Sequence, residues 1–323
     1  MANKTRTLSF FSYKGGAGRS TLAFNIIPIL ASEYFKPTKE HPMIIIDTDV
    51  DSCGMSYLVG VEKKDITTEN CVQHLLSVGC DTSPSIRSVA AHPFLSKLCP
   101  VGNAYGYPIN EAILLMPAKD GMAITGRDNY GDKDEPFSKK IDSFLTVCNN
   151  LGIPAVIFDS AVGNTATANI SNEAANLIIC CMRPTTQFTD GTERFLRSLE
   201  NMDGNDAGKT FSQKNIILVP NAIPRGESVI NGDKYPETAF SKIRNNFENK
   251  FSDEYTFHHY HFDMLDKREF GIPVVDRFMW CEDILYTRDD LDENEKVALQ
   301  RYKKLAGVIN EVLENADADS EDF

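Results

Sequence analysis

The chain has 323 residues, of which 42% are hydrophobic and 24% charged, and its formal net charge is −13. This composition is typical of a globular protein with a full core, arranged as one large α/β domain or two small ones, and it disfavours a protein that grips nucleic-acid phosphates through a generally basic surface. The chain contains no apolar run of about 18 residues and no secretory signal pattern, so we expect no membrane span and a cytoplasmic location.

Apolar, β-rich runs alternate with helical periodicity along the whole chain. Pro28 falls inside the first predicted helix, where it is expected to kink the helix or interrupt its hydrogen bonds. We expect strands at residues 7–13, 43–47, 112–117, 155–159, 176–182 and 215–221, and helices at 20–35, 137–152, 189–202 and about 292–314. Continuous apolar strands alternating with helices predict an α/β fold, with a mostly parallel twisted sheet and helices on both faces.

The domain organisation follows from this alternation. Residues 1–314 are predicted to form a single domain, because neither an internal repeat nor a sharp change in composition divides them. No motif is recognised in the stretch from about 60 to 110, which we interpret as a variable segment. The last residues, 315–323, are acidic and polar, and we expect a flexible tail there.

A glycine-rich stretch, KGGAGRST at residues 14–21, follows the first predicted strand. Its three glycines let backbone N–H groups approach a polyphosphate closely, and the following helix directs its positive end to the same place. Ser20 is placed to offer its hydroxyl to Mg²⁺, and Thr21 to bond a phosphate. The stretch predicts a nucleotide phosphate-binding loop, with a turn that binds no ligand as the alternative.

Aspartates follow two later strands. IIIDTDVD contains Asp47 and Asp49, and VIFDSAVGN contains Asp159. A carboxylate at a strand end beside a phosphate loop is well placed to hold magnesium, directly or through water. We expect Asp159 and Asp47 on the metal side and Asp49 over the terminal phosphate, where it would orient the attacking water. The alternative is capping of the next helix, a role that suits Asp51 better.

Ligands of parallel sheets bind beyond the carboxyl ends of the strands. The polar residues at those ends, Lys14, Asp47, Asp159 and Asn221, are therefore expected to converge on one site. This convergence argues more strongly for nucleotide binding than the glycine-rich loop alone.

These motifs resemble those of the ParA/MinD superfamily of P-loop ATPases. KGGAGRST is similar to its deviant Walker A motif, IIIDTDVD to its second aspartate motif, and VIFDSAVGN to its Walker B stretch, with Ala161 in place of proline. LVPNAIPR is similar to the strand that ends in an adenine-reading asparagine, which corresponds to Asn221. The resemblance covers about residues 5–313.

The resemblance implies an ATPase with ATP and Mg²⁺ as cofactors. It implies a homodimer in which two monomers sandwich two ATP molecules, with Lys14 reaching the partner's nucleotide, and a switch that acts on an unidentified protein partner or cargo. Candidate catalytic residues are Lys14, Asp49 and Arg19, and candidate metal ligands are Ser20, Asp47 and Asp159. The candidate nucleotide-binding residues are Gly15, Gly16, Ala17, Gly18, Arg19, Ser20, Thr21, Asn221 and Pro273.

Arg19 departs from the family pattern, which has lysine at this position of the loop. Arginine keeps the charge but is longer and planar, so the two are not interchangeable. We expect ATP to bind and hydrolysis to be slow or dependent on a partner; a second possibility is that Lys14 takes over more of the charge neutralisation. A nucleotide sensor that does not hydrolyse is the competing class.

Other features are assigned structural roles. The eight cysteines, none in a CxxC pair, are expected to be free buried thiols, and the HHYH cluster at residues 258–261 a loop or strand. RYKK, residues 301–304, is interpreted as a solvated helix face. The acidic C-terminal residues disfavour direct membrane binding, and the net charge disfavours nonspecific DNA binding without excluding a local basic patch.

Overall fold

The computed structural model describes residues 4–122, 137–183, 185–202, 215–223, 259–261 and 271–319, and only the backbone of residues 197–202, 259–261 and 316–319. Within these ranges the strands are β1 (Arg6–Ser12), β2 (Met43–Asp47), β3 (Cys99–Pro100), β4 (Ile113–Met116), β5 (Ala155–Val162), β6 (Leu177–Met182), β7 (Asn215–Pro220) and β8 (His259–His261).

The α-helices of the described ranges alternate with these strands. They are α1 (Arg19–Ile29), α2 (Gly54–Leu58), α3 (Val72–Val78), α4 (Phe137–Asn150), α5 (Ala166–Ala174), α6 (Thr186–Met202) and α8 (Glu293–Asp319). Short 3₁₀ turns cover Val89–Ala91, Leu95–Lys97, Gly102–Tyr105, Asn110–Ala112, Asp276–Met279 and Leu285–Thr287.

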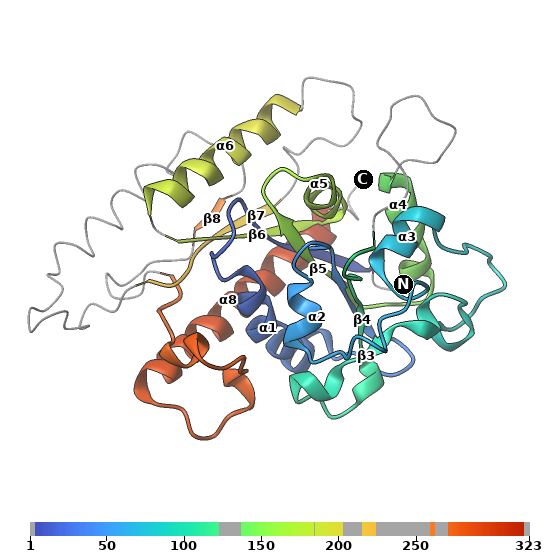
Figure 1. Cartoon of the computed structure of the whole chain (residues 1–323), viewed down its shortest axis with the longest axis horizontal. Coiled ribbons are helices and arrows are strands. Elements are labelled where there is room, and N and C mark those ends of the chain that lie inside the picture. The colour runs from blue at the N-terminus through green and yellow to red at the C-terminus, as the bar shows by residue number, and fades with distance from the viewer. Residues whose placement is uncertain are drawn as a thin grey trace, which may run out of the picture.

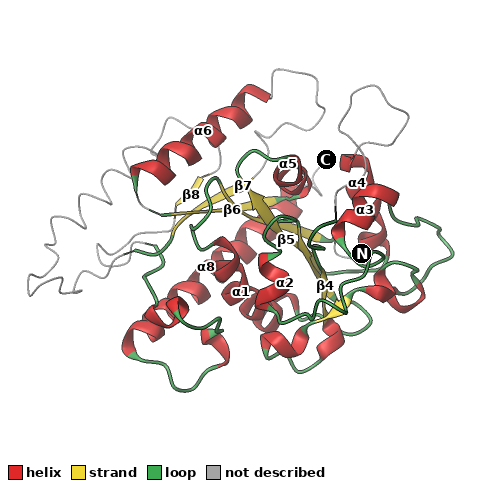
Figure 2. Cartoon of the chain, viewed as in Figure 1, coloured by secondary structure: helices red, strands yellow, loops and turns green. Residues whose placement is uncertain are grey.

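The strands form one sheet in the order β3-β4-β2-β5-β1-β6-β7-β8. Figures 1 and 2 show this sheet running through the molecule between helices. Every pairing is parallel except that of β3 with β4. The predicted fold class, a mostly parallel α/β sheet of the P-loop type, is confirmed. Because the central strands are parallel, their carboxyl ends meet at one edge of the sheet, where the glycine-rich loop follows β1.

Helices cover both faces of the sheet (Figure 1). Alternate residues of a strand point to opposite faces, so Ile45 and Ile157 belong to the core cluster that also contains residues of α1 and α8. Their neighbours Ile46 and Phe158 belong to a second cluster, with residues of α3 and α4. All five residues of β2 are buried, as expected for a central parallel strand.

The first helix passes through its proline. Pro28 lies inside α1, and the chain then continues as a π-helical segment, Leu30–Phe35. Proline has no N–H to donate, so the hydrogen-bond ladder is interrupted there, as predicted. The predicted helix at 20–35 is thus two helical pieces in sequence.

The last helix is longer than its periodicity predicts. The predicted stripe of Ala298, Tyr302, Leu305, Ile309 and Val312 is buried. However, α8 continues to Asp319, so residues 315–319, expected to belong to a flexible tail, are helical, and residues 320–323 lie outside the described ranges. The single-domain division at residue 314 stays a prediction.

Asn25 ties α1 to the segment before α8. Its Nδ2 donates to the carbonyl oxygen of Asp283 at 3.2 Å, and its Oδ1 accepts from the N–H of Leu285 at 3.0 Å. The Asn25 side chain is buried, so these bonds satisfy backbone groups that would otherwise lack a partner.

We predict that Asn25→Ala lowers the free energy of unfolding by about 1–3 kcal/mol, because it leaves buried backbone groups unsatisfied. Urea unfolding followed by circular dichroism measures this. Asn294→Ala, at an exposed position of α8, is the matched control and should stay within about 0.5 kcal/mol of the wild type. Equal stabilities for the two variants would contradict this role of Asn25.

Candidate nucleotide and metal site

The glycine-rich loop connects β1 to α1 at the carboxyl edge of the sheet. Gly16 and Gly18 have φ of 79° and 81°, in the left-handed region that favours glycine. Asn221, directly after β7, donates from Nδ2 to the carbonyl oxygen of Ala17 at 2.8 Å. A Cβ on Gly18 would lie 2.6 Å from this Nδ2, so the sequence needs glycine here for both conformation and space.

The outer side of the loop is open. Among the described residues, the backbone N–H groups of Gly15, Gly16, Ala17 and Gly18 donate to no other protein group. A Cβ added to Gly15 or Gly16 would meet no atom within 4 Å. Backbone N–H groups need hydrogen-bond acceptors, and those of this loop lie next to the N-terminus of α1. The loop is therefore suited to bind a phosphate.

Three buried carboxylates lie beside the loop. Asp47 and Asp159 face each other in the parallel pairing of β2 with β5. Asp49 follows two residues later, and its N–H donates to Oδ1 of Asp47 at 3.2 Å. The predicted convergence of these aspartates is therefore present.

Arg19 connects two of these carboxylates. Its Nε donates to Oδ1 of Asp159 at 2.9 Å, and its NH2 donates to Oδ2 of Asp49, also at 2.9 Å. Ser20 donates from Oγ to Oδ2 of Asp159 at 2.8 Å. The Arg19 side chain is only 6% exposed. Arg19 therefore faces the metal side of the predicted site, whereas its assignment from sequence was to the phosphates.

Burial is the largest single influence on the pKa of Arg19, Asp47 and Asp159, and it sets the direction of the shift for the two aspartates. Burial would lower the pKa of Arg19, but the Asp159 charge and the hydrogen bond to Asp49 outweigh it, so the pKa of Arg19 is raised. Burial raises the pKa of Asp159 despite the neighbouring guanidinium. Burial, together with the Asp159 charge, raises the pKa of Asp47 to about 7.

Asp47 has its own partners at the start of α2. The N–H and the hydroxyl of Ser56 both donate to Oδ2 of Asp47, at 2.9 and 2.8 Å. Sequence reasoning missed Ser56, because its role depends on a short helix that has no clear hydrophobic period.

The predicted cap by Asp51 is wrong: α2 has no side-chain cap, and Ser52 donates its N–H to Asp49 at 3.4 Å.

The donor atoms fit a magnesium ion in kind, because Ser20 and the aspartates supply the oxygen ligands that Mg²⁺ prefers. Within the described ranges, however, no group of three or more His, Cys, Asp or Glu residues is arranged to hold a metal by itself. Mg²⁺ is usually held by one or two carboxylates together with substrate phosphates, so the open loop and the carboxylates together match its requirements.

The remaining predicted site residues lie around the loop. Lys14 is half-buried and has no ion pair among the described residues. Thr21 is half-buried in the first turn of α1. Pro273 forms a parallel bridge with Ile223, just beyond Asn221, and so lies on the same edge. Their contacts with a nucleotide stay predictions.

The loop also packs closely against α6. A Cβ on Gly191 would overlap Cδ1 of Tyr13, so a glycine in α6 admits the tyrosine ring that precedes Lys14. Sequence reasoning missed this contact, for which a glycine inside a helical pattern is the available signal.

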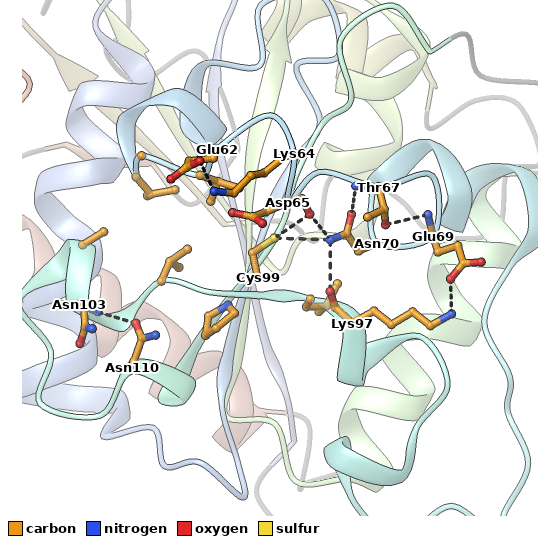
Figure 3. A pocket seen from close by; sticks show the side chains of 17 residues that line it. Glu62, Lys64, Asp65, Thr67, Glu69, Asn70, Lys97, Cys99, Asn103 and Asn110 are labelled. Atoms are coloured by element: carbon orange, nitrogen blue, oxygen red, sulfur yellow. Dashed lines mark hydrogen bonds and ion pairs between the residues drawn. The ribbon is translucent and has the colours of Figure 1, made fainter.

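The segment 60–110 forms a separate groove. The groove has a volume of about 860 Å³ and lies beside β3. Its polar groups bond one another: the Asn70 side chain donates to the backbone carbonyl oxygens of Asp65 and Lys97, and the Lys97 ammonium pairs with Glu69 (Figure 3). It shares no lining residue with the nucleotide loop.

Cysteine and histidine predictions hold in part. Six of the eight cysteines are free and buried, but Cys80 is half-buried and Cys281 is exposed, contrary to expectation. His259–His261 forms β8, consistent with the strand assignment, and His258 lies outside the described ranges. In the described part of the chain, no helix has the length and apolarity needed to cross a membrane.

Solved structures share this architecture. McdA from Cyanothece in complex with ATP is 13% identical over 97% of both chains, with a TM-score of 0.58. MinD from Pyrococcus horikoshii with Mg-ADP is 15% identical over 97% of this chain and 98% of its own, with a TM-score of 0.55. The pNOB8 ParA bound to nonspecific DNA is 14% identical over 98% of this chain and 99% of its own, with a TM-score of 0.55.

No family model and no curated protein matches the sequence. At these identities the likeness shows the fold alone, and that fold is the one of the ParA/MinD P-loop ATPases.

We predict that Gly18→Ala lowers the free energy of unfolding by at least about 1–2 kcal/mol, because alanine is strained at positive φ and its Cβ displaces Asn221. Gly15→Ala is the matched control: its φ is not positive and its surroundings are open, so we expect a change within about 0.5 kcal/mol. Thermal unfolding compares the two, and equal losses would contradict this account of the loop.

Proposed function

We propose that this protein is an ATP-binding and ATP-hydrolysing switch that forms a sandwich homodimer when loaded and then acts on a protein partner or cargo. The observation that carries the proposal is the meeting of an open N–H loop, Ser20 and the buried aspartates at one edge of the sheet. The fold supports it, since McdA and MinD with this fold have been solved with ATP and Mg-ADP.

Each residue has a task in this mechanism. The N–H groups of residues 15–18 bind the phosphates, and the N-terminus of α1 adds its dipole. Ser20 and Asp159 would hold Mg²⁺, which would supply charge neutralisation at the phosphate oxygens. Asp49 orients water for attack in line with the leaving group. Asp49 and Asp159 are buried, which strengthens their charge interactions.

Lys14 is suited to act across a dimer interface. It lies in the exposed loop and has no intramolecular ion pair among the described residues, so its ammonium is available to a phosphate of a second copy. That arrangement makes the dimer dependent on bound ATP.

We predict that the wild type dimerises in ATPγS with Mg²⁺ and that Lys14→Ala stays monomeric while keeping its fold. Size-exclusion chromatography with light scattering measures the mass, and circular dichroism checks the fold. Lys64→Ala is the control, because Lys64 is an exposed lysine paired with Glu62 in the separate groove. An unaffected dimer in Lys14→Ala would refute the sandwich.

The rate of hydrolysis depends on Arg19. We predict that Arg19→Lys raises the basal rate of phosphate release by about tenfold, equivalent to about 1.4 kcal/mol of activation free energy. A lysine cannot span both aspartates with one planar fork, so it would turn to the phosphates. Phosphate release measured with a coupled assay tests this, and unchanged ATP binding and turnover would contradict it.

A nucleotide sensor that does not hydrolyse is the second candidate. The ion pairs of Arg19 with Asp49 and Asp159 favour it, because they engage the groups assigned to water and metal. A wild-type protein that binds ATP but releases no phosphate, alone or with cell lysate, would establish the sensor.

Features of the described surface bear on the partner class. The interpretation of RYKK as a solvated helix face is wrong in part, because Arg301 and Tyr302 are buried. Lys303 is exposed and lies 3.9 Å from Glu33, so the described part of this segment contributes few free positive charges. This weighs against DNA binding through α8, although the pNOB8 ParA with the same fold binds nonspecific DNA. We therefore favour a protein partner.

A further inference from the structure

Arg19 is bonded to the oxygens that the sequence assigns to a metal. Asp159, the predicted magnesium partner, has both carboxylate oxygens engaged, one by Nε of Arg19 and the other by Oγ of Ser20. The NH2 of Arg19 also lies 3.2 Å from Oγ of Ser20. Two predicted metal ligands are therefore held in one network with the guanidinium.

The planar fork of arginine makes this arrangement possible. Nε and NH2 point in fixed directions, and each reaches a different carboxylate at 2.9 Å. A lysine ammonium is a single point charge, so it would not reproduce both bonds with this geometry. The arginine that replaces lysine in the loop therefore makes two hydrogen bonds to carboxylates that a lysine would not make.

The guanidinium also keeps an unused donor. Its NH1 is buried and has no hydrogen-bond partner, although the side chain is only 6% exposed. Arg277 offers a comparison: Nε and NH2 bond Glu295 at 2.6 and 3.1 Å, and NH1 bonds Asp283 at 3.4 Å. Of these two arginines, only Arg19 has a guanidinium nitrogen, NH1, without a hydrogen-bond acceptor. A phosphate oxygen is one acceptor that could bind it.

We infer that Arg19 is the resident cation of the metal side of this site. It neutralises Asp159 and Asp49 in the nucleotide-free protein and competes with a divalent cation for them. In the loaded site Ser20 and Asp159 would hold Mg²⁺, and the guanidinium would leave the carboxylates and bond phosphate oxygens of the nucleotide.

The inference rests on the proposed function, but its test does not need a nucleotide. Binding of Mn²⁺ alone to the nucleotide-free full chain is measured by electron paramagnetic resonance of the free ion. We expect Arg19→Ala to bind one Mn²⁺ at least tenfold more tightly than the wild type, because removing the guanidinium frees both carboxylates. Arg19→Lys should show a smaller gain of at least threefold.

Two controls assign the effect to this site. Arg87→Ala removes an exposed arginine that has no ion pair among the described residues, and it should bind Mn²⁺ as the wild type does. Adding Asp159→Asn to Arg19→Ala should abolish the gain. If circular dichroism shows that Arg19→Ala does not fold, Arg19→Lys carries the test.

Equal Mn²⁺ affinities in the wild type and the Arg19 variants would overturn the inference, as would a gain that survives Asp159→Asn. A separate titration with a fluorescent ATP analogue distinguishes the two levels of the account. If ATP binds but the Mn²⁺ affinities of the variants are unchanged, the inference about Arg19 is wrong and the proposed function stands. If the Arg19 variants bind Mn²⁺ more tightly but ATP does not bind, the inference about Arg19 is supported and the proposed function is wrong.

Discussion

Carboxylates buried at the ends of neighbouring strands need a cation within reach, and in this protein Arg19 supplies it. Asp47 and Asp159 are fully buried and directly opposite each other in the sheet. Burying an isolated charge destabilises the folded protein, and removing one partner of a buried ion pair lowers the free energy of unfolding by about 3–5 kcal/mol. The pairing of Arg19 with Asp159 and Asp49 therefore constrains the loop, the start of α1 and the ends of β2 and β5 together.

The parallel sheet explains why these groups meet. The loop after β1, the aspartates at β2 and β5, and Asn221 after β7 come from distant parts of the chain, yet the shared strand direction brings them to one edge. Hydrogen bonds then set the finer positions. Ser56 donates a hydrogen bond to Asp47, and Asn221 donates one to the carbonyl oxygen of Ala17. The open N–H groups of the loop are left for a ligand.

Sequence patterns predicted the elements around this edge and the residues that gather there. Apolar runs such as MIII predict buried strands because both faces of such a strand are covered, and the glycines and strand-end aspartates mark the site. Sequence patterns could not predict which groups the Arg19 side chain contacts, because a side chain at the base of the loop can point to phosphates or to carboxylates. The choice depends on tertiary distances of 2.9 Å. Ser56 and the packing of Tyr13 on Gly191 depend in the same way on contacts between distant segments.

The most direct test is a pair of crystal structures of the wild type with a non-hydrolysable ATP analogue, one grown with Mg²⁺ and one with a chelator. The account predicts the polyphosphate on residues 15–18 in both. It predicts that Arg19 keeps Asp159 in the chelated crystal and bonds phosphate oxygens in the Mg²⁺ crystal. A nucleotide bound elsewhere, or an Arg19 that keeps both aspartates while Mg²⁺ is bound beside Asp159, would contradict it.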